Sequence, residues 1–599
     1  MRNYLLFPVV SGILTITTLA IARFPSTIQL DETNADVTVF GATASDDAGR
    51  KLASGDINGD GAIDLVVFSS SASPLGRRFV GRTDIVWGIA ELDSVVDLQN
   101  STAVSRILGA SADGGVSSNV ACADLNKDGF DDVVIGVPCQ SPFVDCDGKV
   151  SIVFGSAAFP DTVDLDAANE EVTVVYGVNM DNGFLGHVMA SGDINGDDYT
   201  DLIIAAFASF PGGHVFVVSG RDSFPDVIDL AATVPDVTRI IDPRPSQATG
   251  RGLACGDLDG DGFDDILIGS PGGNPPDTDG EATLLFGSDS LPDTVFLTDP
   301  SVRMKRFLPV PQHTIGKVGH CPQIADVNGD SYEDIVLSAY QAEPFGCISC
   351  GEVYIVFGPV TDLPDTVHLE STELPITRLI GSGTSRNYGQ IMAGGDVDAD
   401  GFDDVMIYSA YESGENGEPF KVTVLYGSSA LPDSVFLDTD STLTRILGET
   451  IPDQFGRAMI VDDINNDGTN DLAVGAAYAD PMGRVDAGKT HVFWGVLTPS
   501  SVAESRVPVL RLLQNYPNPF SSTTTIDYEI ANPGNISITI YNVLGQRVTK
   551  FERRHATEGL QSIIWDGRDS DGRVIPSGIY FYRLQIVGTV ETKKMVLIR

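Results

Sequence analysis

Seven short acidic segments share one spacing, and their side chains are the groups in this sequence best suited to chemistry. Each segment has Asp at position 1, Asn or Asp at position 3, and Asp at positions 5 and 9. A turn at position 6 would bring these oxygen atoms together. All-oxygen donors in a flexible loop suit Ca²⁺ better than Mg²⁺, which requires a tighter octahedron. We therefore expect up to seven Ca²⁺ sites, one in each segment.

The predicted ligands form seven sets of four side chains. In chain order they are Asp56, Asn58, Asp60 and Asp64; Asp124, Asn126, Asp128 and Asp132; Asp193, Asn195, Asp197 and Asp201; Asp257, Asp259, Asp261 and Asp265; Asp326, Asn328, Asp330 and Asp334; Asp396, Asp398, Asp400 and Asp404; and Asp463, Asn465, Asp467 and Asp471. Position 6 is Gly in five copies, and it is Asp198 or Ser331 in the other two. A metal-free hairpin turn rich in Asp and Asn is the alternative for a single copy. Seven copies with the same spacing favour metal binding.

The segments recur at intervals of 68, 69, 64, 69, 70 and 67 residues, which indicates a repeat architecture. Short apolar runs surround each segment and are bounded by Gly, Pro and Asp, as in DLVVFS at 64–69 and VSIVFG at 150–155. Such runs are typical of β-strands. Each repeat contains four of them: one before the segment, one after it, one that ends near glycine, and one after a variant of PDTVDL.

Four short antiparallel strands repeated seven times predict an all-β fold, a seven-bladed β-propeller over residues 27–495. A linear β-solenoid is the alternative, although solenoid turns are usually much shorter than these repeats. Val37–Phe40 matches the fourth, outer strand of other repeats, and the last repeat ends at its third strand, His491–Trp494. We expect these two segments to pair and close the ring, because an open ring would expose unpaired edges. Pairing of 37–40 with Asp84–Trp87 would instead make each repeat its own blade.

Composition limits the partners and divides the chain. The net charge of −46 over 599 residues makes nucleic acid an unsuitable partner, and the apolar content of 42% is that of a globular protein. Residues 509–599 carry 11 Lys and Arg against 8 Asp and Glu. This basic segment is therefore predicted to be a separate domain that follows a linker at 496–508.

The N-terminus has the pattern of a secretory signal peptide over residues 1–22. Arg2 precedes an uncharged, largely apolar stretch, and Ala20 and Ala22 fit a cleavage site that requires small residues. A membrane anchor is the alternative, although the stretch is short for a spanning helix. We expect the mature protein to be secreted or held at the cell surface.

The repeats resemble a known family. The acidic segment, the FG pair that ends the third run, and the patches IGVP at Ile135 and IGSP at Ile268 are similar to FG-GAP repeats. These repeats form the seven-bladed head of integrin α subunits and occur in bacterial surface proteins. The FG and GAP motifs are incomplete in the first, third and sixth repeats, whereas every acidic segment is complete. The resemblance implies a calcium-stabilised propeller that binds an extracellular protein or glycan, without naming that ligand.

Residues 509–599 predict a small β-sandwich, because the alternating runs Thr525–Ile530 and Ile536–Val543 lie among closely spaced turns. The YPNPF start, the SGIYFYRL strand and the KKMVLIR end resemble the C-terminal sorting domain of the bacterial type IX secretion system. They also resemble the related immunoglobulin-like domain of flagellar hook-cap proteins. The resemblance implies export through the secretion machinery, and an accessory sandwich is the alternative. Asp566, Asp569 and Asp571 are expected to form a tight hairpin rather than another cation site.

The sequence shows no catalytic constellation. G-x-S-x-G and H-E-x-x-H are absent, and the seven His are scattered. The segment Gly483–Thr490 matches a phosphate-loop pattern, but a strand is expected after it where that chemistry needs a helix. We therefore expect a non-catalytic binding or adhesion protein, and a carbohydrate-active enzyme built on a propeller is the alternative.

Cysteine spacing predicts local disulfides, since an exported chain meets an oxidising environment. The expected pairs are Cys139 with Cys146 and Cys347 with Cys350. A zinc site that combines Cys347, Cys350 and Cys321 is the weaker alternative.

Overall fold

The structure is a computed structural model, and it describes residues 23–598 with several short gaps. The gaps are 31–34, 89–93, 111–118, 139–147, 168–171, 178–183, 210, 231–234, 246, 273–279, 310–315, 383–385, 411–419, 451, 496–509, 513–514, 516–517, 519, 531–533, 543–545, 556–558, 571 and 587–588. The predicted signal segment, 1–22, therefore lies outside the described residues. Two compact units, 1–499 and 500–599, make up the chain. In the described part of the chain, no helix is long and apolar enough to cross a membrane.

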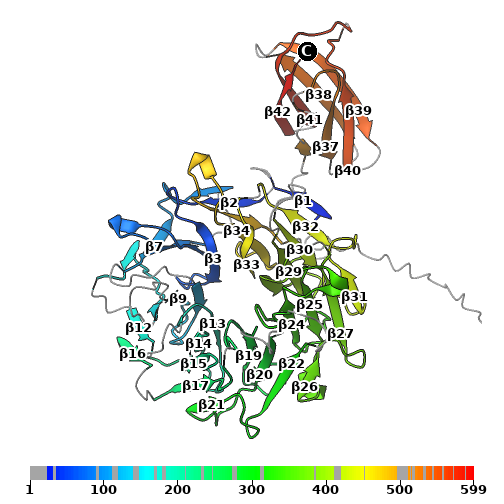
Figure 1. The fold of residues 1–599 in the computed structure, drawn as a ribbon. Helices are drawn as coiled ribbons and strands as arrows, with labels where there is room; N and C mark the ends of the chain where they lie inside the picture. The colour runs from blue at the N-terminus through cyan, green and yellow to red at the C-terminus, as the bar shows by residue number, and fades with distance from the viewer. Residues whose placement is uncertain are drawn as a thin grey trace, which may run out of the picture. The chain divides into compact units, whose positions relative to one another are not determined.

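Seven five-stranded sheets form the first unit, and Figure 1 shows them arranged around a ring as the blades of a propeller. The first four strands of each sheet are antiparallel neighbours, as in β3, β4, β5 and β7 of the first blade. A short fifth strand then pairs in parallel with the fourth, as β11 does with β7. The sequence predicted four strands in each blade, so that prediction was wrong by one strand.

The inner three strands of each blade come from one repeat. The first strands are β3 (Ala48–Gly55), β8 (Asn119–Ala123), β13 (Met189–Gly192), β18 (Gly252–Gly256), β23 (Gln323–Ala325), β28 (Met392–Gly395) and β33 (Phe455–Asp462). The second strands are β4 (Asp64–Ser69), β9 (Asp132–Val137), β14 (Asp201–Ala206), β19 (Asp265–Ser270), β24 (Asp334–Ala339), β29 (Asp404–Ser409) and β34 (Asp471–Ala476). The third strands are β5 (Arg82–Val86), β10 (Lys149–Val153), β15 (His214–Val218), β20 (Glu281–Leu285), β25 (Glu352–Val356), β30 (Lys421–Leu425) and β35 (Lys489–Phe493).

The outer two strands complete each blade, in the same order. The fourth strands are β7 (Val104–Leu108), β12 (Val172–Tyr176), β17 (Val237–Ile241), β22 (Met304–Leu308), β27 (Ile376–Ile380), β32 (Thr444–Leu447) and β2 (Val37–Phe40). The fifth strands are β11 (Thr162–Asp164), β16 (Val227–Asp229), β21 (Thr294–Phe296), β26 (Thr366–His368), β31 (Ser434–Phe436), β1 (Thr27–Gln29) and β6 (Val95–Asp97).

The fifth strands are the PDTVDL-like segments of the sequence, and each crosses to the preceding blade. β6, for example, lies between β5 and β7 in the chain but pairs with β2 of the seventh blade. Only three residues of each segment pair, so the segment is too short for a periodic signal, and sequence reasoning took it for a connection. The crossing links neighbouring blades through backbone hydrogen bonds.

The two ends of the propeller segment meet as the sequence predicted. β2 pairs antiparallel with β35, with Val37 opposite Val492 and Phe40 opposite Lys489. The pairing lies slightly earlier in the last repeat than the predicted His491–Trp494, and it confirms that the N-terminal strand completes the seventh blade. β1 in turn completes the sixth blade by pairing with β32. The first strands of successive blades contact one another around the ring, including β33 with β3.

The hydrophobic core is divided among the junctions between neighbouring blades, with one cluster at each of them. Every residue of the second strands is buried, and successive side chains enter different clusters. Leu65 and Val67 pack toward the seventh blade, whereas Val66 and Phe68 pack toward the second. Because both faces of the strand are covered, its sequence is a continuous apolar run without polar alternation.

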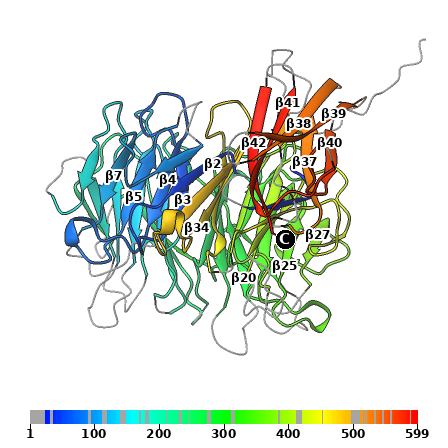
Figure 2. The ribbon, with the colours of Figure 1, turned by 90° about the horizontal axis from the view of Figure 1, so that it is seen from above.

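Each blade presents loops at both ends of its strands, and Figure 2 shows the strands running between two loop-bearing faces. The acidic segments join first to second strands, and the loops between second and third strands leave the opposite end. Three of the latter contain a short 3₁₀ helix: η1 (Pro74–Gly76), η3 (Pro344–Gly346) and η5 (Pro481–Gly483). A fourth, η4 (Val360–Asp362), follows β25.

The second unit is a sandwich of two sheets, as predicted. One sheet contains β36 (Leu510–Leu512), β37 (Thr524–Ile530) and β40 (Gly559–Trp565), and the other contains β39 (Arg547–His555), β38 (Gly534–Asn542), β41 (Gly578–Ile586) and β42 (Thr589–Leu597). Both sheets contribute to one core, in which Trp565 of the first lies with Tyr582 of the second. Asp569 accepts the backbone N–H of Arg573 at 2.8 Å, in agreement with the predicted hairpin, and Asp571 lies outside the described residues.

Candidate cation sites in the acidic loops

The seven acidic segments all form tight loops, and every predicted ligand lies in a described residue. Position 6 has left-handed backbone in every loop, with φ between 65° and 89°, at the five glycines and at Asp198 and Ser331 alike. Position 4 is also left-handed, with φ between 53° and 74°. The predicted turn is therefore present in all seven copies, and the two non-glycine residues at position 6 adopt it at a steric cost.

The position 1 carboxylate holds the loop closed. It accepts the backbone N–H groups of positions 5 and 6 at 2.7–3.2 Å in every copy. The residues concerned are Asp56, Asp124, Asp193, Asp257, Asp326, Asp396 and Asp463. Since a carboxylate oxygen has two acceptor sites, these bonds leave capacity for a cation.

Positions 3 and 5 add shorter-range bonds within the same loop. The position 5 carboxylate accepts the N–H of position 7 at 2.9–3.2 Å in Asp60, Asp128, Asp197, Asp261, Asp330, Asp400 and Asp467. The position 3 oxygen accepts the N–H of position 5 in Asn58, Asn126, Asp259, Asn328 and Asn465. Asn195 instead donates to Asp201 at 3.5 Å, and Asp398 accepts from Arg23.

The position 9 carboxylate is buried and connects the loop to the third strand. These side chains are Asp64, Asp132, Asp201, Asp265, Asp334, Asp404 and Asp471, and each is at most 1% exposed. One oxygen accepts an N–H from position 2, or from position 3 in the last copy, at 3.0–3.2 Å. The other accepts the N–H of the glycine that follows the third strand, at 2.7–3.0 Å.

Burial makes the charged form of these position 9 carboxylates costly. Desolvation, assisted by neighbouring carboxylates of the same loop, raises the pKa to about 8 in Asp404 and to about 7 in the other six copies. The backbone N–H donors act in the opposite direction but do not restore the ordinary value. A bound cation would supply the compensating positive charge that these buried carboxylates lack.

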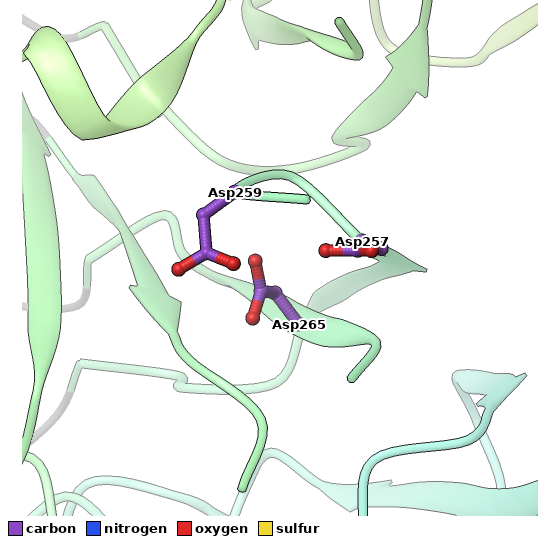
Figure 3. Close-up of side chains that lie close together, drawn as sticks. All are labelled: Asp257, Asp259 and Asp265. Carbon is purple, nitrogen blue, oxygen red and sulfur yellow. The ribbon is translucent and has the colours of Figure 1, made fainter. Parts of the chain in front are cut away.

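Two loops have a carboxylate at position 3 as well, and there the acids converge most closely. Ligand oxygens of Asp257, Asp259 and Asp265 all lie within 4.8 Å of one another, as do those of Asp396, Asp398 and Asp404. Figure 3 shows the first of these groups. In the other five loops the position 3 donor is Asn, whose neutral amide oxygen is also a suitable Ca²⁺ ligand.

Each of these two loops meets an arginine that rests on an aromatic ring. Arg303 pairs with Asp259 at 2.5 Å, and its guanidinium carbon lies 3.9 Å from the centroid of the Phe286 ring. Arg23 pairs with Asp398 at 2.9 Å and lies 4.4 Å from the centroid of the Tyr426 ring. Sequence reasoning did not find these arginines, because they come from distant segments of the chain.

Two further positions support the loops and were not singled out from the sequence. Position 2 is apolar in all seven copies, and Ile57 there is fully buried between the first and second blades. Position 8 of the second loop, Asp131, accepts the backbone N–H of Asp56 in the first loop at 2.7 Å. Asp264 and Asp403 make the same bond to the third and fifth loops. The loops are therefore joined in three pairs.

Comparisons with known families match both units in part. Residues 249–285 and 455–493 match the FG-GAP repeat, and residues 514–598 match the secretion system C-terminal sorting domain. The chain combines FG-GAP repeats with a C-terminal secretion sorting domain. The sorting domain indicates secretion or attachment to a bacterial cell surface.

Curated relatives share the repeat region. Integrin alpha pat-2 of Caenorhabditis briggsae is 30% identical over 245 residues, which cover 39% of this chain and 18% of the relative. Phosphatidylinositol-glycan-specific phospholipase D of Bos taurus is 33% identical over 168 residues, which cover 28% of this chain and 19% of the relative. The chain thus spans less than a fifth of the length of either relative.

Among solved structures, the match to PorZ of Porphyromonas gingivalis covers 92% of this chain and 81% of the PorZ chain. The two are 12% identical and the TM-score is 0.20, a likeness too weak to support an argument.

The geometry explains the glycine of the FG-GAP word FG. In the fourth repeat, a β-carbon on Gly287 would lie 2.4 Å from the backbone oxygen of Asp264. In the second repeat, a β-carbon on Gly155 would lie 2.5 Å from the oxygen of Asp131. The backbone of the third strand must pass this close for the glycine N–H to reach the position 9 carboxylate, so only glycine fits.

The weaker sequence motifs have structural explanations. The phosphate-loop match leads into strand β35, and Lys489 pairs with Glu449 at 2.7 Å, so this segment has no phosphate-binding architecture. Cys347 and Cys350 form a disulfide, as expected, which contradicts the zinc alternative. Cys321 is a free thiol, and the predicted pair Cys139 and Cys146 lies outside the described residues.

Proposed function

We propose that the protein is a secreted or surface-displayed propeller that is stabilised by Ca²⁺ and acts as a non-catalytic binding or adhesion module. The observation that carries this proposal is the separation of the two faces. The acidic loops occupy one end of the strands, and the three most exposed large apolar side chains among the described residues, Leu75, Phe345 and Met482, occupy loops at the other end. One face then serves stability, and the opposite face is free to contact a ligand.

The donor chemistry of the acidic loops supports Ca²⁺. Each loop offers three or four carboxylates, with the amide oxygen of Asn completing the set where position 3 is not Asp. Oxygen donors from a loop with left-handed turns suit the flexible coordination of Ca²⁺, whereas Mg²⁺ usually keeps several waters. A cation bound only by the folded chain adds to its stability by linkage. We assign Ca²⁺ to up to seven loops, held by the residues at positions 1, 3, 5 and 9.

The opposite face supports the binding role through three matching loop tips. Leu75, Phe345 and Met482 occupy the middle of η1, η3 and η5, with exposed fractions of 74%, 82% and 76%. All three have φ between 53° and 54°, in the left-handed region. An exposed apolar side chain on strained backbone is costly to keep, and such features concentrate at binding sites.

The carbohydrate-active alternative and the phospholipase relatives both raise the question of catalysis. Cys321, which follows His320 in the chain, has a raised pKa because of burial, so the thiol stays protonated and is a weak nucleophile. Ser71 and His320 both line one cavity of the propeller, but the Ser71 hydroxyl donates to Asp47 at 2.5 Å rather than to a histidine that could act as its base. These observations favour binding without turnover.

A binding screen with a matched turnover assay tests this proposal. The calcium-loaded chain is applied to a glycan array and to a panel of extracellular proteins, and bound candidates are followed for product formation. We expect binding without product. The triple variant Leu75→Asn, Phe345→Asn and Met482→Asn should lose this binding. The matched control replaces the exposed Val95, on the outer β6, by Asn. Product formation, or equal loss in the control, would contradict the proposal.

A further inference from the structure

A cavity of about 480 Å³ lies on the axis of the propeller. All seven blades contribute to its wall, mostly through the first strands and the residues just before them. In Figure 1 the first strands β3, β13 and β33 lie toward the centre of the ring. The lining residues lie at the start of these strands, whereas the acidic loops follow their ends. The cavity is therefore on the side of the apolar loop tips, and its volume is in the range of small-molecule sites.

The wall of this axial cavity is basic, in contrast to the rest of the chain. It carries four cationic side chains, Arg50, Lys51, Arg251 and Arg457, and the described lining contains a single carboxylate, that of Asp47. The whole chain has a net charge of −46. A cleft lined by one sign of charge concentrates ligands of the opposite sign, and here the sign is opposite to that of the protein.

The four cations lack carboxylate partners within ion-pair distance among the described residues. Arg50 donates to the hydroxyl of Tyr478 at 3.1 Å, and Arg251 lies over the ring of Phe207 at 4.7 Å. The buried Nε of Arg457 has no hydrogen-bond partner in the described structure. Guanidinium donors that remain available in a partly buried site are suited to bidentate bonds with an oxyanion.

Electrostatic effects agree with this geometry. Burial, and then the charges of Arg251, Arg50 and Arg457, lower the pKa of Lys51. Burial also lowers the pKa of His320 to about 4, with further lowering by Arg251, so this imidazole is neutral at pH 7. The cations are thus close enough to repel one another, and a bound anion would relieve that repulsion.

We propose that the axial cavity binds a small ligand bearing a divalent oxyanion or two carboxylates. The inference deepens the binding role proposed above and rests on it, because it adds an anion site, with its ligand chemistry, on the same face as the apolar loop tips. Neutral side chains in the wall, among them Gln323, Gln390 and Asn119, can bond to polar groups elsewhere on such a ligand. Inorganic sulfate, a dicarboxylate and a phosphorylated sugar all offer the required charge.

Calorimetric titration of the whole calcium-loaded chain tests the site. The probes are sodium sulfate, sodium succinate and glucose 6-phosphate, at constant ionic strength, with sodium chloride and glucose as controls. We expect one molecule of at least one probe to bind per chain and neither control to do so. Arg251→Gln and Arg457→Gln should each weaken binding by about tenfold to a hundredfold, as expected for loss of a charge-assisted hydrogen bond.

Arg78→Gln is the matched control, because Arg78 is exposed in the loop after β4 and does not line the cavity. It removes the same charge and should leave affinity unchanged. Removing an uncompensated cation from the cavity should maintain or raise the thermal midpoint without ligand, so lost binding in Arg251→Gln would not reflect unfolding. No binding of any probe, or equal weakening by Arg78→Gln, would overturn the site.

The same samples separate this inference from the proposed function. If the chain binds a ligand in the screen but binds none of the probes, the axial site is contradicted and the proposed binding role is not. Turnover of a bound probe would contradict the non-catalytic role while supporting the site.

Discussion

The ring of Phe130, in the second acidic loop, lies where a β-carbon on Gly59 of the first loop would have to sit, with Cε1 only 2.5 Å away. Phe263 and Phe402 approach Gly196 and Gly329 in the same way. The glycine at position 4 of the first, third and fifth loops is therefore a packing requirement imposed by the next blade. The loop pairs are joined both by this contact and by the position 8 carboxylate.

Gly59→Ala should destabilise the propeller more than Gly260→Ala does. Gly260 is the matched control, since it also occupies position 4 and has φ of 74°, but a β-carbon added there would meet no described atom within 4 Å beyond its chain neighbours. Both substitutions put alanine in left-handed backbone at a cost of about 1–2 kcal/mol. Overpacking against Phe130 should add about 1–3 kcal/mol for Gly59 alone. Denaturant unfolding measures the difference, and equal effects would show that the contact is not tight.

Opening the ring should weaken the propeller far more than loss of an ordinary terminus. Deletion of residues 23–41 removes β1 and β2, and with them the buried Val37 and Val39 of the junction between the seventh and first blades. It also exposes the edge of β35. Thermal denaturation of this chain beside the intact one should show a large drop in midpoint. An unchanged midpoint would mean that the pairing of β2 with β35 does not stabilise the ring.

Stability of the calcium-free chain should fall as pH rises. The folded-state pKa of the position 9 carboxylates is raised from 3.8 to about 7 or 8, for example in Asp64 and Asp404, because burial disfavours the charged form. The folded state thus binds more protons than the unfolded state, and the contribution of these groups is full below pH 3.8 and lost as pH passes about 7. Thermal midpoints in EGTA should decrease from pH 5 to pH 8. Excess Ca²⁺ should remove or reverse this slope, and a rising midpoint in EGTA would contradict it.

Deletion of residues 509–599 should leave the propeller folded but prevent its export. The chain splits into separate compact units near this boundary, and residues 514–598 match the secretion sorting domain. Fractionation of cells that express the intact and truncated chains measures export, and calcium-dependent unfolding of the truncated chain controls for folding. Normal surface display of the truncated chain would refute the sorting role for this segment.

Much of the architecture could be predicted because it is repeated. The acidic spacing and the apolar runs recur in each repeat, so weak local signals add up, and the position of Val37–Phe40 within the repeat predicted the ring closure that β2 and β35 form. The fifth strands were missed because Val95–Asp97 pairs over three residues with another repeat, and no local periodicity reports such a contact.

The loops were predicted as single units, and their connections were not. No sequence pattern indicates that Asp131 bonds to the backbone of Asp56, because the two residues lie in different repeats and meet only when the blades pack. The same holds for Arg23 and Asp398, which are far apart in the chain. The axial cavity was not predicted, although the sequence holds a signal for it: Arg50, Arg251 and Arg457 each follow a glycine and lie six residues before the first Asp of an acidic segment.

Counting bound calcium while following thermal unfolding tests the central claim most directly. The purified propeller is freed of metal with EGTA, titrated with Ca²⁺ in a calorimeter, and melted with and without the ion. We expect several Ca²⁺ ions to bind per chain, up to the seven acidic loops, and the midpoint to rise on binding. A variant with Asn at the position 9 residues Asp265 and Asp404 should bind two fewer ions. No measurable binding, with the same midpoint in EGTA and in excess Ca²⁺, would contradict the account.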